Sequence, residues 1–212
     1  MVTFIIIRHG YSEGNKEKRF SGQMDIPLDQ IGVFQAKCIA KYIVENFNID
    51  SIYASDLSRA YETVKPLADE LGIEIIKDEN LREIDVGKWQ GMLIETVKEN
   101  YPEEFELYRA NPGILRFVDG ESYDDAMYRS SGAFEKIAQE NDGKTVVVGT
   151  HGGIIRALNA KWDRVPLEKM KDIAIVPNAS ISVATFDNGK VSWQQIGYVG
   201  HLGDKTSEVG IK

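Results

Sequence analysis

The chain has 212 residues, 42% of them hydrophobic, which is enough to bury a full core in one domain, and we expect a single domain over residues 1–212. A net charge of -8 and a pI near 5.0 exclude a positive overall field of the kind that attracts nucleic acids or anionic membranes. A single cysteine, Cys38, excludes an internal disulfide, and there is neither a signal-peptide pattern nor an apolar run of about 20 residues. We therefore expect a cytoplasmic protein with no membrane or nucleic-acid partner.

Strand and helix patterns alternate along the chain. Residues 2–7, "VTFIII", are a continuous apolar run, typical of a central strand in a parallel sheet. Further patterns predict a helix at 30–46, a strand at 51–55, a helix at 58–71 before Gly72, a strand at 145–150 and a late hairpin at "DNG". This alternation predicts an α/β fold, a three-layer α/β/α sandwich with a mostly parallel central sheet.

The charged segment around residues 92–140 is more helical and carries loop signals at "NPG" and "DGES". We expect it to form a helical, lid-like insertion over the strand ends. Four aromatic residues in or near its first part either line a pocket or pack in the core: Trp89, Phe105, Tyr108 and Phe117.

Cationic and imidazole side chains follow three of the predicted strands. Arg8 and His9 end the first, Arg59 comes shortly after the second, and His151 ends the third. Ligands bind outside the carboxyl ends of strands in open α/β sheets, so these four side chains should meet at one rim. A glycine follows each histidine, and the backbone N–H groups at the start of the next helix favour an anion. The guanidinium group of arginine can also make two parallel hydrogen bonds to a phosphate. The pattern therefore predicts a phosphate site.

Simpler interpretations exist for each residue alone. A single histidine at a strand end more often bonds a backbone group, and a lone arginine is usually a solvated charge. Two of only three histidines, however, occupy matching positions, whereas His201 is expected to be structural or exposed. No metal-binding spacing accompanies them, and arginines would repel a cation, so we expect no metal. Nucleotide-binding glycine loops are also absent from the sequence.

Five stretches, taken together, resemble the histidine phosphatase superfamily, whose best-known branch is the cofactor-dependent phosphoglycerate mutases. They are "RHGYSEGN", "SGQMDIPLDQIGVFQA", "SDLSRAYET", "LREIDVGKWQG" and "VVVGTHGGIIRAL", in the family's order over most of the chain. The resemblance implies a phosphoglycerate mutase-like fold.

The resemblance also implies a role for each matched residue. His9 would be the nucleophile that becomes phosphohistidine, with its other ring nitrogen donating to a backbone carbonyl. Glu83 would be the general acid and base. The groups that hold the phosphoryl oxygens or contact the substrate would be Arg8, Arg59, His151, Asn15, Ser21, Gly22 and the backbone of Gly152. Tyr11 stands where the family usually has Glu or Gln, which reshapes the pocket mouth.

Mutases of this family typically have Arg-His-Tyr-Gly directly after the acid glutamate, where this chain has Ile84 and Asp85. We therefore expect a metal-independent phosphatase that needs no cofactor and hydrolyses a small phosphorylated metabolite. Two alternatives remain open: a cofactor-dependent phosphoglycerate mutase, and a catalytically weak phosphate-ester binding protein. Arg82 and Arg116 are either contacts for an acidic substrate or solvated charges, and no oligomeric state is predicted.

Overall fold

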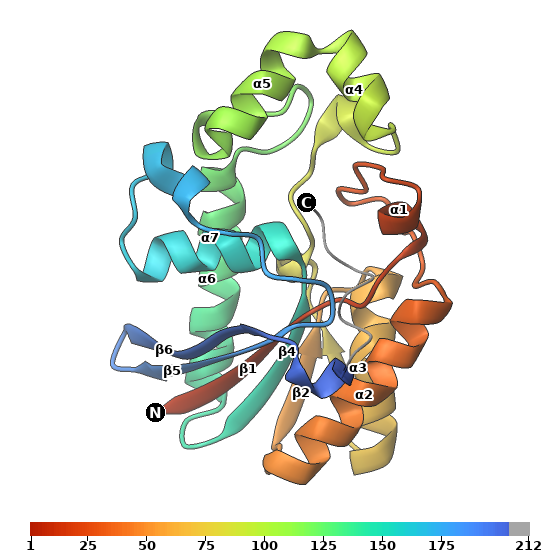
Figure 1. Ribbon diagram of the computed structural model, residues 1–212. Coiled ribbons are helices and arrows are strands. Elements are labelled where there is room, and N and C mark those ends of the chain that lie inside the picture. Colours follow the sequence, from red (N-terminus) through yellow and green to blue (C-terminus); the bar gives the residue numbers. More distant parts are fainter. Residues whose placement is uncertain (204–212) are drawn as a thin grey trace.

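The computed structural model describes residues 1–203, and its central sheet has six strands in the order β3-β2-β4-β1-β5-β6. The first four in this order run parallel, and β5 and β6 add an antiparallel edge (Figure 1). The strands are β1 (Val2–Arg8), β2 (Ser51–Ala54), β3 (Ile75–Lys77), β4 (Thr145–Thr150), β5 (Ile181–Asp187) and β6 (Lys190–Tyr198). The predicted mixed α/β fold with a mostly parallel sheet is confirmed.

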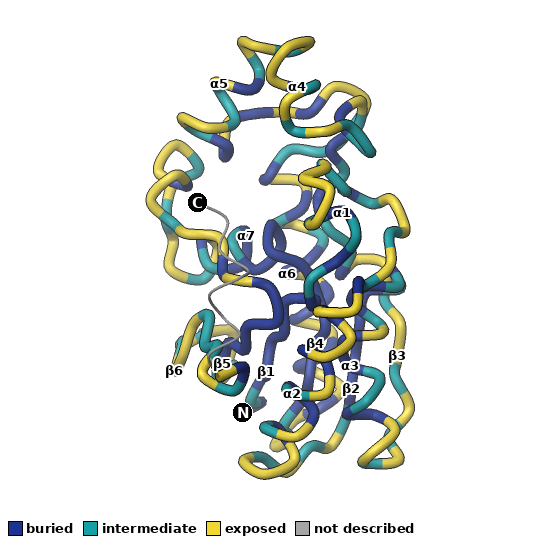
Figure 2. Tube along the Cα trace, turned by 45° about the vertical axis from the view of Figure 1, so that its right-hand side comes forward, coloured by how far each residue is buried: buried dark blue, intermediate teal, exposed yellow. Residues whose placement is uncertain are grey.

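Strand β1 is apolar throughout because both faces of the sheet are covered. Phe4 and Ile6 join one core cluster and Ile5 and Ile7 the other, all fully buried, as expected for alternating side chains. Figure 2 shows β1 and β4 among the most deeply buried parts of the trace. Two helices cover each face: α6 (Tyr123–Glu140) and α7 (Gly152–Trp162) on the first, α2 (Gln30–Asn46) and α3 (Ser58–Leu71) on the second.

The helix ends follow local signals in the sequence. Asp29 caps α2 by accepting from the N–H of Gly32, and Gly72 ends α3 with φ of 65°, a left-handed conformation that favours glycine. Ser122 begins α6 with a capping box to Asp125. The same box at Ser12 starts the short α1 (Glu13–Lys16).

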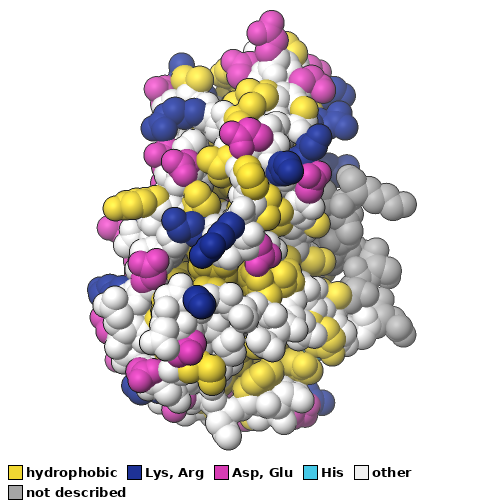
Figure 3. All heavy atoms as spheres, turned by 90° about the vertical axis from the view of Figure 1, so that its left-hand side faces the viewer, with side chains coloured by type: hydrophobic (Ala, Val, Ile, Leu, Met, Phe, Trp, Pro, Cys, Tyr) yellow, Lys and Arg dark blue, Asp and Glu magenta, His cyan; other side chains and the backbone are white. Residues whose placement is uncertain are grey.

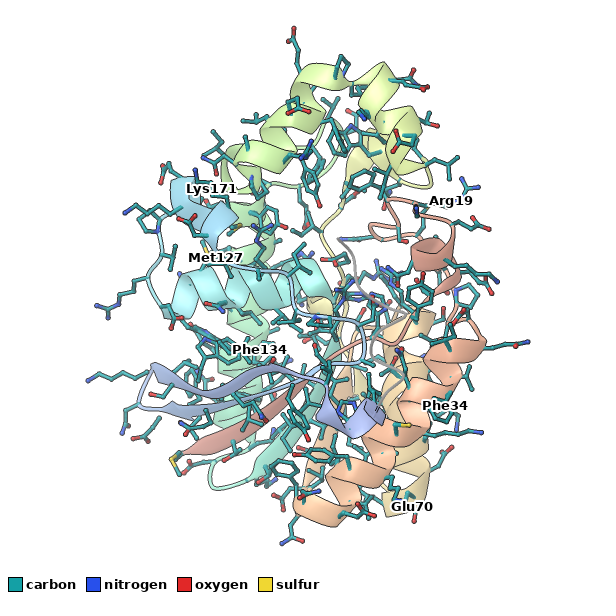
Figure 4. All side chains as sticks on the ribbon, viewed as in Figure 1. Arg19, Phe34, Glu70, Met127, Phe134 and Lys171 are labelled. Carbon is teal, nitrogen blue, oxygen red and sulfur yellow. The ribbon has the colours of Figure 1, made fainter. Side chains whose placement is uncertain are left out.

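The predicted insertion divides into two parts. Helices α4 (Ile94–Asn100) and α5 (Pro102–Ala110) stand beyond the carboxyl ends of the strands, at the top of Figure 1. In contrast, α6 packs along the sheet, and Figure 4 shows Phe134 pointing from it toward the strands, where its ring centroid lies 4.9 Å from that of Phe4. Residues 92–140 therefore include both helices above the rim, α4 and α5, and a helix that covers the sheet, α6.

Most of the insertion's aromatic residues pack against one another. Trp89, Phe105 and Phe117 are buried, and the Trp89 ring lies 5.2 Å from Phe117 and 5.7 Å from Tyr108. Tyr108 alone of the four is only partly buried; burial raises the pKa of its hydroxyl, which also interacts with the charges of Arg156, Glu83 and Arg8. Core packing is thus the role of three of them, and Tyr108 faces the strand ends.

Short 3-10 helices complete the framework: η1 (Glu79–Leu81), η2 (Gly87–Trp89), η3 (Pro112–Ile114) and η4 (Leu167–Asp172). Across the described residues, none of the helices combines the length and apolar character needed to cross a bilayer.

Acidic and basic side chains are interspersed on the face of the molecule drawn in Figure 3. Cys38 lies partly buried on α2, against the core on that side of the sheet.

Candidate active site

Two histidines lie side by side where β1 and β4 end. Arg8 pairs with Thr150 in the parallel register, so the next residue of each strand, His9 and His151, leaves the sheet at the same level. Their ring centroids are 5.2 Å apart, and both side chains are buried. The first turn of α3 adds Arg59, which is 1% exposed. The structure thus brings the four predicted residues to one rim.

His9 has the protonation that a nucleophile needs. Its Nδ1 lies 2.7 Å from the carbonyl oxygen of Gly10 and donates to it, so Nε2 carries the lone pair. Nε2 has no hydrogen-bond partner among residues 1–203. Burial and the charges of Arg59 and Arg8 hold the pKa of His9 well below its usual value, which keeps the ring neutral.

Hydrogen bonds from several elements hold the backbone that carries His9. The N–H of Gly10 donates to Thr63 Oγ1 at 2.9 Å, and Asn178 Nδ2 donates to the carbonyl of His9 at 3.1 Å. A Cβ on Gly10 would lie 2.9 Å from the carbonyl oxygen of Gly32, so only glycine allows α2 to come this close. The nucleophile therefore stands on a rigid support.

Both arginines use part of their guanidinium group to bond backbone carbonyls. Arg59 donates to Met24 at 2.8 Å and to Gly22 at 2.7 Å, and Arg8 donates to Val176. Neither forms an ion pair with a carboxylate within residues 1–203. Burial lowers the pKa of Arg59 to about 10, so the group remains a cation at neutral pH.

Three buried donors at this rim lack a partner among the described residues: Arg8 Nε, Arg59 Nε and His151 Nδ1. Buried polar atoms are almost always hydrogen-bonded, so a cluster of unpartnered donors that includes two positively charged groups indicates the binding site of an anionic ligand. His151 Nε2 lies 2.9 Å from Ser55 Oγ, which also accepts from the N–H of Leu57. With the Ser55 hydroxyl donating to Nε2, the neutral ring carries its proton on Nδ1, where it can donate to a ligand.

Glu83 lies beside this cluster at the beginning of α7. Its Oε1 accepts from the N–H of Ile84 at 2.9 Å and its Oε2 from the N–H of Gly153 at 3.1 Å. A Cβ on Gly153 would approach Glu83 Oε1 to 2.4 Å, so a side chain there would displace the carboxyl group. A half-buried carboxyl next to an anion site can give and take a proton.

The remaining predicted residues surround the cluster in different ways. Asn15 Oδ1 accepts from Ser12 and Asn178, which leaves its amide N–H groups as donors. Gly152 lies close to the guanidinium of Arg8, since a Cβ there would be 3.0 Å from its Nε. Gly22 supports Arg59 through its carbonyl, and Ser21 packs against α1.

The two other candidate arginines have protein partners. Arg82 makes a two-fold contact with Asp56, and Arg116 pairs with Asp125 in an exposed position. His201 lies apart, packed against the neighbouring rings of Tyr42 and Tyr198.

Several supporting residues were missed by the sequence analysis: Gln23, Ser55, Thr63, Glu121, Arg129 and Asn178. Ser55 and Thr63 lie in the quoted stretch "SDLSRAYET", which was a signal for them. Asn178 and Arg129 are separated from the motifs, and only the fold brings them close.

Comparison with known proteins gives consistent matches over almost the whole chain. A family model described as the histidine phosphatase superfamily (branch 1) matches residues 4–198. Phosphoserine phosphatase 1 of Hydrogenobacter thermophilus is 34% identical over 96% of both chains. A metal-independent phosphoserine phosphatase of Arabidopsis thaliana is 29% identical, over 94% of this chain and 84% of that one. A mycobacterial glucosyl-3-phosphoglycerate phosphatase, solved with VO3, superposes with a TM-score of 0.86 at 26% identity, covering 93% and 99%.

Proposed function

Because this chain belongs to the histidine phosphatase superfamily, branch 1, we propose that it hydrolyses small phosphate monoesters through a phosphohistidine formed on His9. Its family and its phosphatase relatives make it a phosphoric monoester hydrolase. The observation that carries the proposed residue roles is the set of three unpartnered buried donors beside the free Nε2 of His9. They match the oxygens of a phosphoryl group that is attacked at this nitrogen.

In the first step, Nε2 of His9 forms a bond to phosphorus while the bond from phosphorus to the ester oxygen breaks. Glu83 gives its carboxyl proton to that oxygen, which leaves as an alcohol. Arg8, Arg59 and the Nδ1–H of His151 stabilise the negative charge on the phosphoryl oxygens, the main contribution in phosphoryl transfer.

In the second step, water attacks phosphorus and the bond to Nε2 breaks. Glu83, now a carboxylate, takes a proton from this water, so the acid form is restored together with neutral His9. The net change is ester plus water to alcohol plus phosphate. General acid and base catalysis of this kind contributes about 10²–10⁴ in rate.

The substrate class we propose is the phosphomonoesters of small hydroxy acids. Arg156 supports it, because this half-buried arginine forms no ion pair within residues 1–203: its guanidinium donates to the carbonyl of Met170 and lies 5.9 Å from the ring centroid of Tyr123. Helical spacing places it on the same face of α7 as Gly153, one turn beyond the point where Glu83 contacts the helix. A carboxylate on the leaving alcohol would meet this charge. The names of the phosphoserine and glucosyl-3-phosphoglycerate phosphatases agree with this chemistry.

The test measures phosphate release in the presence of a chelator, from two matched pairs of substrates. Phosphoserine is compared with phosphoethanolamine, and 3-phosphoglycerate with glycerol 3-phosphate, so that each pair differs in the carboxylate. We expect release that is lost in His9→Ala, an acid-labile label on the wild-type protein, and a preference of at least about tenfold for the carboxylates that disappears in Arg156→Met.

Equal rates within each pair would contradict the hydroxy-acid proposal while leaving the hydrolase intact. Interconversion of phosphoglycerates with added bisphosphoglycerate, without phosphate release, would instead favour a mutase. Failure to form phosphohistidine with any ester would support the binding protein.

A further inference from the structure

Arg129 of α6 and Glu121, just before this helix, form an ion pair beneath the segment that carries Glu83. Arg129 Nε donates to Glu121 Oε1 at 2.7 Å and its NH2 donates to Oε2 at 2.8 Å, so the guanidinium group and the carboxylate form a bidentate ion pair. The side chains are 16% and 22% exposed, unlike the other ion pairs of the described chain, which lie nearer the surface.

The same guanidinium also holds the backbone that leads up to the proposed acid, including the carbonyl of Glu83 itself. Its NH1 donates to the carbonyls of Asn80 and Arg82, both at 2.8 Å, and its NH2 donates to that of Glu83 at 2.9 Å. With the two bonds to Glu121, all five N–H donors of Arg129 have an acceptor. A lysine at this position has three donors and cannot make this set.

Glu121 continues the support on the far side of Glu83. Its Oε2 accepts from the N–H of Asp85 at 3.0 Å, and its own N–H donates to the carbonyl of Asp85 at 2.8 Å. Residues 80–85 are therefore clamped from one side by a single charged pair. Gln23 adds a second bond to the carbonyl of Glu83, at 3.1 Å.

We propose that Arg129 and Glu121 are positioning residues that set the carboxyl group of Glu83 against the leaving oxygen. This inference rests on the proposed function, in which Glu83 is the acid. Within residues 1–203 the Glu83 carboxyl accepts two hydrogen bonds, from the N–H groups of Ile84 and Gly153, so its place depends on where its own backbone lies. A displacement of about 1 Å in a catalytic group can cost roughly 10²-fold in rate.

A leaving-group comparison separates this role from simple support of the fold. Nitrophenolate is a stable anion that departs with little help from an acid, whereas phenolate needs the proton more, and the two phenyl phosphates have nearly the same shape. Since kcat/KM covers the steps up to formation of phosphohistidine, a misplaced acid should slow phenyl phosphate and spare p-nitrophenyl phosphate. A damaged fold should slow both equally.

The variants are Arg129→Lys and Glu121→Gln, with Glu83→Gln as the reference for a missing acid. We expect the ratio of kcat/KM for p-nitrophenyl phosphate over phenyl phosphate to rise about tenfold or more in both variants, in the direction of Glu83→Gln. Arg116→Lys is the matched control, because Arg116 pairs with Asp125 between the same loop and α6 at an exposed position. Its ratio should equal that of the wild type.

An unchanged ratio in Arg129→Lys and Glu121→Gln would overturn the inference, whether both rates fall together or neither does. If Arg129→Lys does not fold, Glu121→Gln decides, since it keeps the shape of the pair. A wild-type protein that releases no phosphate from these two esters, from phosphoserine or from 3-phosphoglycerate would overturn the proposed function, and the positioning role with it. A wild-type protein that is active while the variant ratios stay flat refutes the positioning role alone.

Discussion

His9 and His151 are adjacent because β1 and β4 run parallel in register, so that one residue past Arg8 and Thr150 the two rings lie 5.2 Å apart. Both rings are buried next to Arg8 and Arg59 and both carry the proton on Nδ1, yet each turns a different nitrogen toward the site. His9 presents a lone pair at Nε2, and His151 presents a proton at Nδ1. The fold thus makes one histidine a nucleophile and the other a hydrogen-bond donor.

Stability should fall when the medium is made mildly acidic. Burial holds the pKa of His9 and His151 well below 6.5, and that of His201 at about 4. The unfolded chain therefore binds more protons than the folded one below pH 6.5, and stability is lost as pH falls toward the folded values. We expect a slope of up to about 1.4 kcal/mol per pH unit for each histidine.

Urea unfolding between pH 7 and pH 5 measures this slope. The variant His151→Asn should show a smaller slope than the wild type, because one of the three groups is removed. Equal slopes would mean that His151 is not held neutral by the fold.

Substitution of Gly153 should disable the acid without unfolding the protein. In Gly153→Ala the new Cβ meets Glu83 Oε1 at 2.4 Å and pushes the carboxyl away, while alanine favours the helix. We expect kcat/KM for phenyl phosphate to fall about 10²-fold. Gly132→Ala on α6 is the control, because a Cβ there meets nothing within 4 Å. It should keep full activity and gain roughly 0.5–1 kcal/mol of stability.

Ser55 should matter through the tautomer of His151. Loss of its hydroxyl in Ser55→Ala removes the donor to Nε2 and lets the ring proton move from Nδ1, so a phosphoryl contact weakens. We expect kcat to fall about tenfold, equivalent to roughly 1.4 kcal/mol. Nitrogen NMR of the imidazole should show the change of tautomer. Ser55→Thr keeps the hydroxyl, and a similar loss of activity there would contradict this explanation.

Vanadate or inorganic phosphate should stabilise the protein against heat. Either anion supplies the acceptors that Arg8 Nε, Arg59 Nε and His151 Nδ1 lack. At a concentration of about 100 times Kd the gain is roughly 2.7 kcal/mol. Arg59→Met should lose most of this shift, measured by thermal unfolding with and without the anion. A shift of the same size in Arg59→Met would place the anion elsewhere.

The local patterns in the sequence predict most of the framework. The runs at residues 2–7 and 145–150 become β1 and β4, and the signals at Asp29 and Gly72 mark helix ends as expected. These features depend on residues close in the chain, so they can be recognised without the fold. The extent of the insertion was less accessible, because α6 has the same helical pattern whether it packs on the sheet or above it.

The sequence by itself determined that two histidines and two arginines lie at or shortly after the carboxyl ends of strands, where a parallel sheet binds ligands. This prediction needs only the strand pattern and the spacing of these residues. Tertiary structure alone decided which ring nitrogen is free, which donors stay unpartnered and that Arg129 and Glu121 hold Glu83 from more than 35 positions away. The physical reason is that hydrogen bonds act over about 3 Å in space. The packing of the layers decides which groups come within this distance, and the spacing of residues along the chain does not show which groups these are.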